Sequence, residues 1–198
     1  MQIRQATYAD RAAVEAVTAA AFGEEPEGRV VTMMRTLEST GAARVGLVAL
    51  HEDELVGHVG LSRGWVDARQ ALVEVLVLSP LSVHPGHQRR GVGTALVAAA
   101  LAFGDDQGWP AVFLEGGWDY YGARGFVSGG SQGFDPPSAR IPERAFQVAV
   151  LTSHEPWMVG RLVYPEAFWL TDTAGVRDPR LARIEELSAQ ANDAGGGT

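Results

Sequence analysis

The feature that most constrains the fold of this chain is an apolar strand that leads directly into a glycine-opened, alanine-rich helix. Residues 72–83 are apolar at nearly every position, which is typical of a central strand covered on both faces. Residues 91–103 carry Val92, Leu96 and Leu101 at helical spacing among alanines. Together the two segments predict one layered domain, α/β or α+β, in which the helix covers the strand.

Shorter segments supply the remaining elements. Further strands are expected at residues 2–5, 44–51, 55–63, 111–114, 145–151 and 158–163. Further helices are expected at residues 9–22, from Glu24 through Leu37, at 119–124 and at 179–191. Thr7 and Asp10 have the spacing of a helix-capping pair, Gly104 is the expected C-terminal cap of the helix at 91–103, and residues 128–142 are expected to form a loop.

Length and composition favour one domain with a tail. The chain has 198 residues, of which 46% are hydrophobic, and this is enough to bury one sizeable core. We expect a domain over residues 1–170 and a C-terminal extension over 171–198 with a surface helix and a glycine-rich end. Neither a leader segment nor a run of roughly 20 apolar residues is visible, so the prediction is a cytoplasmic protein that does not enter a membrane.

Charge and cysteine content narrow the classes of function. Asp and Glu number 24 against 16 basic residues, all of them arginine, which gives a formal net charge of −8. So acidic a chain is a poor partner for nucleic acid, because binding there depends on neutralising phosphates. The absence of cysteine excludes disulfides, thiolate metal sites and a cysteine nucleophile.

The turn between the apolar strand and the helix has the residues of a phosphate cradle. It reads His84-Pro85-Gly86-His87-Gln88-Arg89-Arg90-Gly91-Val92-Gly93-Thr94. Glycines let backbone N–H groups approach an anion, the helix N-terminus adds partial positive charge, and the arginines add donors. A P-loop needs lysine where Val92 stands, and the dinucleotide fingerprint needs glycine where Leu96 stands. The turn therefore predicts phosphate binding, and another kind of nucleotide-binding protein stays an alternative.

Two sequence blocks resemble the GNAT superfamily of N-acetyltransferases, and the resemblance covers roughly residues 2–169. Residues 88–93, Gln-Arg-Arg-Gly-Val-Gly, are similar to the Gln/Arg-x-x-Gly-x-Gly/Ala loop for the acetyl-CoA pyrophosphate in that family, and residues 80–85 resemble the end of its fourth strand. Residues 120–126, Tyr-Tyr-Gly-Ala-Arg-Gly-Phe, resemble the Tyr-x-x-x-Gly-Phe block of its paired-tyrosine branch. Arg124 and the Gly-Gly-Trp-Asp at residues 116–119 depart from that branch.

This resemblance implies both a fold and a site. The implied fold is a mixed, largely antiparallel sheet flanked by helices and splayed between the fourth and fifth strands. The implied co-substrate is acetyl-CoA, and no metal is expected. Tyr121, four residues before Gly125, would give a proton to the leaving thiolate, and Tyr120 is the weaker candidate. The implied cofactor-binding residues are Leu81, Ser82, Val83, Gln88, Arg89, Arg90, Gly91, Val92, Gly93 and Thr94.

The predicted reaction is direct attack of a primary amine, from a small molecule or a peptide, on the thioester. A backbone N–H near residues 81–83 would stabilise the charge that develops on the carbonyl oxygen. The base that deprotonates the amine is left open among Glu74, His84, Glu115 and a chain of water molecules. The acidic net charge favours a cationic amine by steering. A homodimer and a catalytically silent acyl-CoA-binding sensor stay open as well.

Two further patterns predict no chemistry. Residues 129–133 match the Gly-x-Ser-x-Gly elbow of hydrolases, but two prolines follow where a helix must begin, so we expect a loop. His84 and His87 have the spacing of metal ligands but lack cysteine partners and a nearby third ligand. We therefore interpret them as histidines at the surface or near the site rather than as metal ligands.

Overall fold

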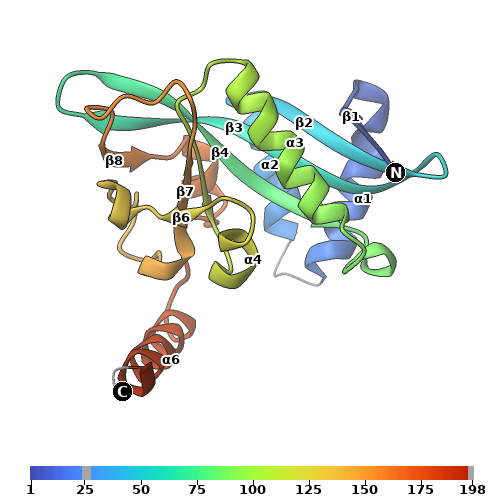
Figure 1. Cartoon of the computed structure of the whole chain (residues 1–198). Helices are drawn as coiled ribbons and strands as arrows, with labels where there is room; N and C mark the ends of the chain where they lie inside the picture. The colour runs from blue at the N-terminus through green and yellow to red at the C-terminus, as the bar shows by residue number, and fades with distance from the viewer. Residues whose placement is uncertain (24–27, 196–198) are drawn as a thin grey trace.

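The protein, described by a computed structural model over residues 1–23 and 28–195, is built around one mixed sheet (Figure 1). The strand order is β1-β2-β3-β4-β5-β7-β6, and β8 pairs with β3 off this path. Strand β4 pairs with β5 in parallel, and the other strand pairs of the described residues are antiparallel. The strands are β1 Gln2–Gln5, β2 Ala43–His51, β3 Glu54–Ala68, β4 Leu72–Val83, β5 Ala111–Glu115, β6 Val127–Ser128, β7 Phe146–Val150 and β8 Gly160–Val163.

Helices cover both faces of the sheet. In Figure 1, α3 crosses the front face, whereas α1 and α2 lie behind it. The helices are α1 Arg11–Phe22, α2 Arg29–Ser39, α3 Val92–Asp106, α4 Trp118–Gly122, α5 Glu166–Leu170 and α6 Arg180–Gly195. Single 3-10 turns are found at Tyr8–Asp10, Pro85–His87, Gly130–Gln132 and Glu143–Ala145.

Strand β4 separates two apolar cores because its side chains alternate between the faces of the sheet. Val75 and Val77 pack in the core that includes Phe113 and α2. Leu76 and Leu78 pack in the core that includes α3. Burial on both faces explains why this strand is apolar almost throughout, and its expected bounds and the expected fold class are confirmed.

The ends of two helices differ from the expected ones. The Thr7 N–H donates to Asp10 at 2.7 Å, so the expected capping pair forms, although it opens a 3-10 turn before α1. Gly104 as a helix cap is wrong: α3 continues to Asp106, and Gly104 is small because a Cβ there would lie 2.9 Å from Leu151 Cδ1. The expected helix start at residues 24–27 lies outside the described residues.

The parallel pairing between β4 and β5 is short. It joins Leu76 to Val112 and Val77 to Phe113, after which β4 continues to Val83 without a β5 partner. On its other side β4 has a bulge, because Leu81 pairs with Val59 and Leu78 pairs with Leu61. The two strands are therefore splayed at their carboxyl ends, as expected, and the edge of β4 over residues 78–83 faces an opening.

Gly57 of β3 allows α3 to approach the sheet closely. A Cβ on Gly57 would lie 2.9 Å from Leu96 Cδ1, 3.0 Å from Val92 Cγ1 and 3.2 Å from the Ser82 carbonyl oxygen. Val92 and Leu96 belong to the first two turns of α3, so this contact sets the distance between the helix start and β4. Any side chain at Gly57 must therefore displace the side chains of Val92 and Leu96 that α3 packs against the sheet.

We therefore expect Gly57→Ala to lower the free energy of unfolding by about 1–3 kcal/mol, the usual cost of overpacking. Urea unfolding followed by circular dichroism measures this difference. Gly122→Ala is the matched control, because a Cβ there meets no atom within 4 Å and should leave stability nearly unchanged. Equal stabilities of the two variants would show that Gly57 does not set the helix position.

Candidate active site

The loop that joins β4 to α3 places glycine where the helix begins. Gly91 is the N-cap of α3 and has a φ of 84°, a left-handed conformation that favours glycine. Arg89, two residues earlier, also has a positive φ of 58°. Gln88 Nε2 donates to the Val83 carbonyl oxygen at 3.1 Å and so folds the loop back onto the strand end. The first N–H groups of α3 therefore face outward beside the open edge of β4.

Helix α4 lies against the first turn of α3. The Arg124 guanidinium donates to Thr94 Oγ1 from Nη2 at 2.8 Å and from Nε at 3.1 Å. The same guanidinium lies 3.6 Å from the centre of the Tyr120 ring and donates to the Tyr120 carbonyl oxygen. A Cβ on Gly93 would meet the Tyr120 hydroxyl, so a larger residue there would displace the Tyr120 side chain. Arg124, a departure from the predicted pattern, thus joins the two helices.

A cleft of about 370 Å³ opens between these parts. The edge of β4, the phosphate loop, α4 and the end of α1 all contribute to its wall. Its lining residues are Ala21, Phe22, Leu81, Val83, Gln88, Arg89, Gly93 and Tyr120. Five of the residues expected to bind the cofactor, Leu81, Val83, Gln88, Arg89 and Gly93, therefore meet at one cavity.

The other expected cofactor residues lie around this cleft in different ways. Gly91 caps α3 between the lining residues Arg89 and Gly93, and Arg90 is exposed beside it. Val92 is buried in the core below α3 and offers its backbone alone. Ser82 points to the opposite face of the sheet, where its hydroxyl donates to Thr18 Oγ1 at 3.1 Å. The Thr94 hydroxyl already accepts hydrogen bonds from Arg124.

The two tyrosines of α4 have different surroundings. Tyr120 lines the cleft and is 38% exposed. Tyr121 is half-buried and packs edge-on against Phe126, with its ring over Gly116. Burial raises the pKa of the Tyr121 phenol to about 12. Within residues 1–23 and 28–195 no group accepts a hydrogen bond from its hydroxyl. The sequence pattern favoured Tyr121, whereas Tyr120, Ala21 and Phe22 could not be placed at the cleft without the fold.

Comparison with known proteins gives this geometry a family. Residues 13–127, which include the phosphate loop and α4, match the Acetyltransferase (GNAT) family. A relative from Escherichia coli strain K12, the uncharacterised N-acetyltransferase YjhQ, is 30% identical over 135 residues, which are 68% of this chain and 74% of that protein. The chain belongs to the GNAT acetyltransferase family.

Solved structures agree on the fold of this acetyltransferase. The GNAT protein YhbS from Escherichia coli, crystallised with CoA, superposes with a TM-score of 0.72 at 22% identity, over 84% of this chain and 91% of that chain. A GNAT acetyltransferase from Brucella melitensis, crystallised with acetyl-CoA, gives a TM-score of 0.68 at 25% identity, over 84% and 97%. The family match and the relative confirm the predicted superfamily, and its paired-tyrosine branch stays a prediction.

Each of the three side chains considered as the base already interacts with another group of the protein. Glu74 forms an ion pair with Arg63 at 3.1 Å, near the start of β4 and away from its splayed end. His84 Nδ1 accepts from the Gly86 N–H at 3.2 Å and shapes the loop. Glu115 is half-buried at the end of β5, where it accepts from the Gly175 N–H at 2.9 Å and hydrogen-bonds to Tyr164. Its carboxylate therefore anchors the chain segment that follows α5.

Three histidines gather beside the phosphate loop. The ring centre of His87 lies 5.9 Å from that of His84 and 5.5 Å from that of His51. Across residues 1–23 and 28–195, no group of three His, Cys, Asp or Glu side chains could hold a metal ion. None of the helices in this part of the chain is long and apolar enough to cross a membrane.

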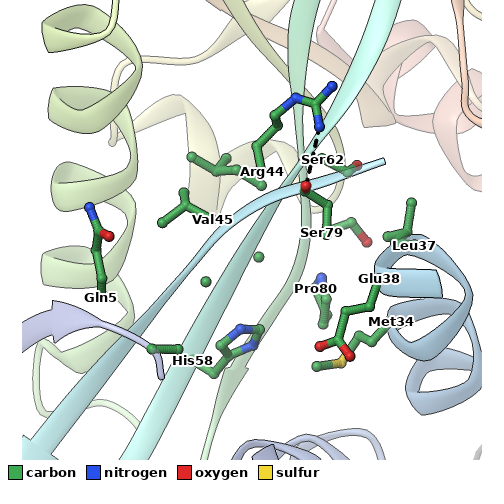
Figure 2. Close-up of a pocket in the computed structure, with 15 residues that line it drawn as sticks. Gln5, Met34, Leu37, Glu38, Arg44, Val45, His58, Ser62, Ser79 and Pro80 are labelled. Carbon is green, nitrogen blue, oxygen red and sulfur yellow. Dashed lines mark hydrogen bonds between the residues drawn. The ribbon is translucent and has the colours of Figure 1, made fainter. Parts of the chain in front are cut away.

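A second cavity, of about 280 Å³, lies on the opposite face of the sheet (Figure 2). Figure 2 shows His58 reaching it from β3, and Met34 and Glu38 reaching it from α2. His58 is 5% exposed, and its Nδ1 is buried without a hydrogen-bond partner among the described residues. Burial lowers the pKa of the His58 imidazole to about 4. The histidine is therefore neutral near pH 7.

The low pKa of His58 predicts a loss of stability in acid. In the unfolded chain this imidazole has a pKa of about 6.5, so unfolding takes up a proton between that pH and about 4. Above pH 6.5 the imidazole does not reduce the free energy of unfolding. As the pH drops to 4, the free energy of unfolding falls by about 3 kcal/mol. Urea unfolding of His58→Gln and the parent between pH 4 and 7 should show a shallower decline for the variant. Parallel declines would contradict the burial of a neutral imidazole.

Proposed function

We propose that this protein transfers an acetyl group from acetyl-CoA to a primary amine of a small molecule or peptide. The observation that carries the proposal is the unpaired edge of β4, which opens beside the glycine-capped start of α3. An extended chain with amide groups fits the strand edge, and a pyrophosphate fits the helix start. Both halves of acetyl-CoA thus have a matching surface in one cleft.

Specific groups of the protein would hold the co-substrate. The N–H groups of the first turn of α3 and the arginine side chains of the phosphate loop would bind the pyrophosphate. Gly91 leaves the approach open, because no atom lies within 4 Å of the position that a Cβ would take. The β4 edge at Leu81 and Val83 would pair with the pantetheine amides. The complexes of the two GNAT structures with CoA and acetyl-CoA support this assignment.

The same edge supplies electrostatic help for the reaction. When an amine attacks a thioester, negative charge develops on the carbonyl oxygen, and a fixed N–H donor stabilises it. The bulge at Ser79 and Pro80 changes the pairing of β4 with β3 directly before Leu81. An N–H of residues 81–83 that faces the opening is free to act as that donor. The attacking nitrogen releases its proton to a water molecule, and the collapse of the intermediate then expels the CoA thiolate.

Tyr121 is our candidate for the group that stabilises the leaving sulfur. Its pKa of about 12 lies above the value of about 8.5 for a thiol. Full proton transfer to the thiolate would therefore be uphill by about 5 kcal/mol. A phenol that stays protonated instead donates a hydrogen bond that strengthens as charge develops on sulfur. Solvent can then supply the proton after the bond has broken.

A panel of amines and peptides, read by release of free CoA from acetyl-CoA, tests the proposed function. We expect CoA release that depends on one class of amine. Tight binding of acetyl-CoA with no release for any amine would instead support a silent acyl-CoA-binding sensor. Failure to bind acetyl-CoA would contradict both functions.

Gly91→Val tests the phosphate site. Valine in a left-handed conformation is strained, so the loop must move and withdraw the helix N–H groups from the pyrophosphate. We expect the affinity for CoA, measured by calorimetry, to fall on the order of 100-fold. Gly86→Ala is the matched control in the same loop, because Gly86 has no positive φ and a Cβ there makes ordinary contacts. A folded Gly91→Val protein that binds CoA like the parent would remove the loop from the site.

Tyr121→Phe tests the role of the phenol. The substitution keeps the ring packing against Phe126 and removes the donor, so CoA affinity should change little. The chemical step, measured in single turnovers, should slow on the order of 100- to 1,000-fold. Tyr120→Phe is the control on the neighbouring residue and should have the smaller effect on that step. An unchanged single-turnover rate in Tyr121→Phe would show that its hydroxyl takes no part.

A further inference from the structure

A third cavity, of about 390 Å³, lies where the start of α2 meets the segment that follows α5. We call it the arginine pocket, because Arg29, Arg177 and Arg180 all line it. The volume is within the usual range for small-molecule sites. One acidic residue, Asp172, is part of the described wall. The described part of its wall is thus cationic, in a chain whose formal net charge is −8.

Asp172 holds two of these arginines in place without neutralising the pocket. Its carboxylate lies 2.7 Å from Arg177 Nε and 3.6 Å from Arg29 Nη1. Arg140, which does not line the pocket, contacts the same carboxylate at 3.1 Å. The hydrogen bond from Arg177 is the main cause that lowers the pKa of Asp172, so this residue is an anion. Among the described residues of the wall, three arginines against one carboxylate leave two positive charges.

Arg180 is available to a ligand. It is the first residue of α6, it is exposed, and no ion pair engages its side chain among the described residues. Helix α2 also begins at this pocket, with Arg29 and Val30 in the wall and no side-chain cap at Gly28. The partial positive charge of that helix start adds to the charge of the arginines. The chemistry of the wall therefore suits a carboxylate or a phosphate group.

The arginine pocket adjoins the proposed cofactor cleft. Phe22, at the end of α1, lines both cavities. On the other side of the pocket, the Gly175 N–H donates to Glu115 at the end of β5, where β5 has separated from β4. The segment 171–177 is thus fixed beside the mouth of the splay. A molecule that reaches from the arginines past Phe22 would arrive at the edge of β4.

We propose that the arginine pocket binds an anionic group of the acceptor, so that the substrate is a small amine carrying a carboxylate or a phosphate. This inference rests on the proposed acetyltransfer and names its substrate class. The C-terminal extension supplies Asp172, Arg177 and Arg180, so it forms part of the acceptor site. Local charge in the pocket, rather than the net charge of the chain, then selects the acceptor.

The first experiment measures anion binding apart from catalysis. Inorganic phosphate and acetate are titrated separately into the protein saturated with CoA, which fills the cofactor cleft, and amide chemical shifts follow the binding. One of the two anions is expected to bind the parent more tightly. We expect Arg180→Gln to lower the affinity for that anion about tenfold or more. The matched control is Arg183→Gln on the same helix, whose side chain pairs with Glu186. No binding of either anion, or equal affinities in the two variants, would overturn the pocket.

The second experiment compares amines that differ by one anionic group. The pairs are β-alanine with β-alaninamide and phosphoethanolamine with ethanolamine, and CoA release gives kcat/KM. We expect the anionic member of one pair to be preferred, and Arg180→Gln to remove that preference through KM. The preferred pair identifies carboxylate or phosphate. Turnover without preference for the anionic member would overturn the acceptor assignment. The parent protein could instead bind an anion that Arg180→Gln does not bind, and yet release no CoA with any of these amines. That result would overturn the proposed acetyltransfer and leave the anion site in place.

Discussion

The short pairing of β4 with β5 is the constraint on which the rest of the structure depends. Two residue pairs hold the strands together, and beyond Val77 the edge of β4 has no strand partner. An open edge buried in a sheet is costly unless its N–H and C=O groups find partners. Gln88 satisfies the Val83 carbonyl, and Leu81 and Val83 line the cleft. The fold thereby keeps a row of main-chain donors and acceptors ready for an extended ligand with amide groups.

The first turn of α3 combines packing and binding in consecutive residues. Val92 faces inward against Gly57, whereas the backbone of the same turn faces the cleft. Gly93 is small because the Tyr120 hydroxyl lies against it. Arg124 then fixes α4 to Thr94. A change at any of these positions moves both the helix start and the tyrosine pair, so stability and cofactor affinity are coupled in this region.

The sequence predicts the parts of the fold whose signals are local. The bounds of β4 follow from its unbroken apolar run, and the Gly91 cap follows from glycine at a helix start. The expected role of residues 81–83 is a main-chain role, but which groups their side chains contact depends on the fold, and the Ser82 hydroxyl bonds to Thr18 of α1. Gly104 was expected to end the helix, but glycine is also found where a helix packs closely against the sheet, and this is its place in α3. The assignment of Tyr120 to the cleft wall likewise depends on the angle of α4, which no spacing of residues reveals.

Electrostatic reasoning from composition has the same limit. A net charge of −8 describes the field at long range, and salt at physiological strength screens that field within about 8 Å. Inside a pocket the nearest groups decide, and Arg29 and Arg177 are brought together there from positions 148 residues apart by their shared partner Asp172. That convergence needs the segment after α5 to return to the start of α2, which the half-buried Glu115 secures through the Gly175 N–H. The carboxylate at the end of β5 thus positions a cationic wall that composition alone would not predict.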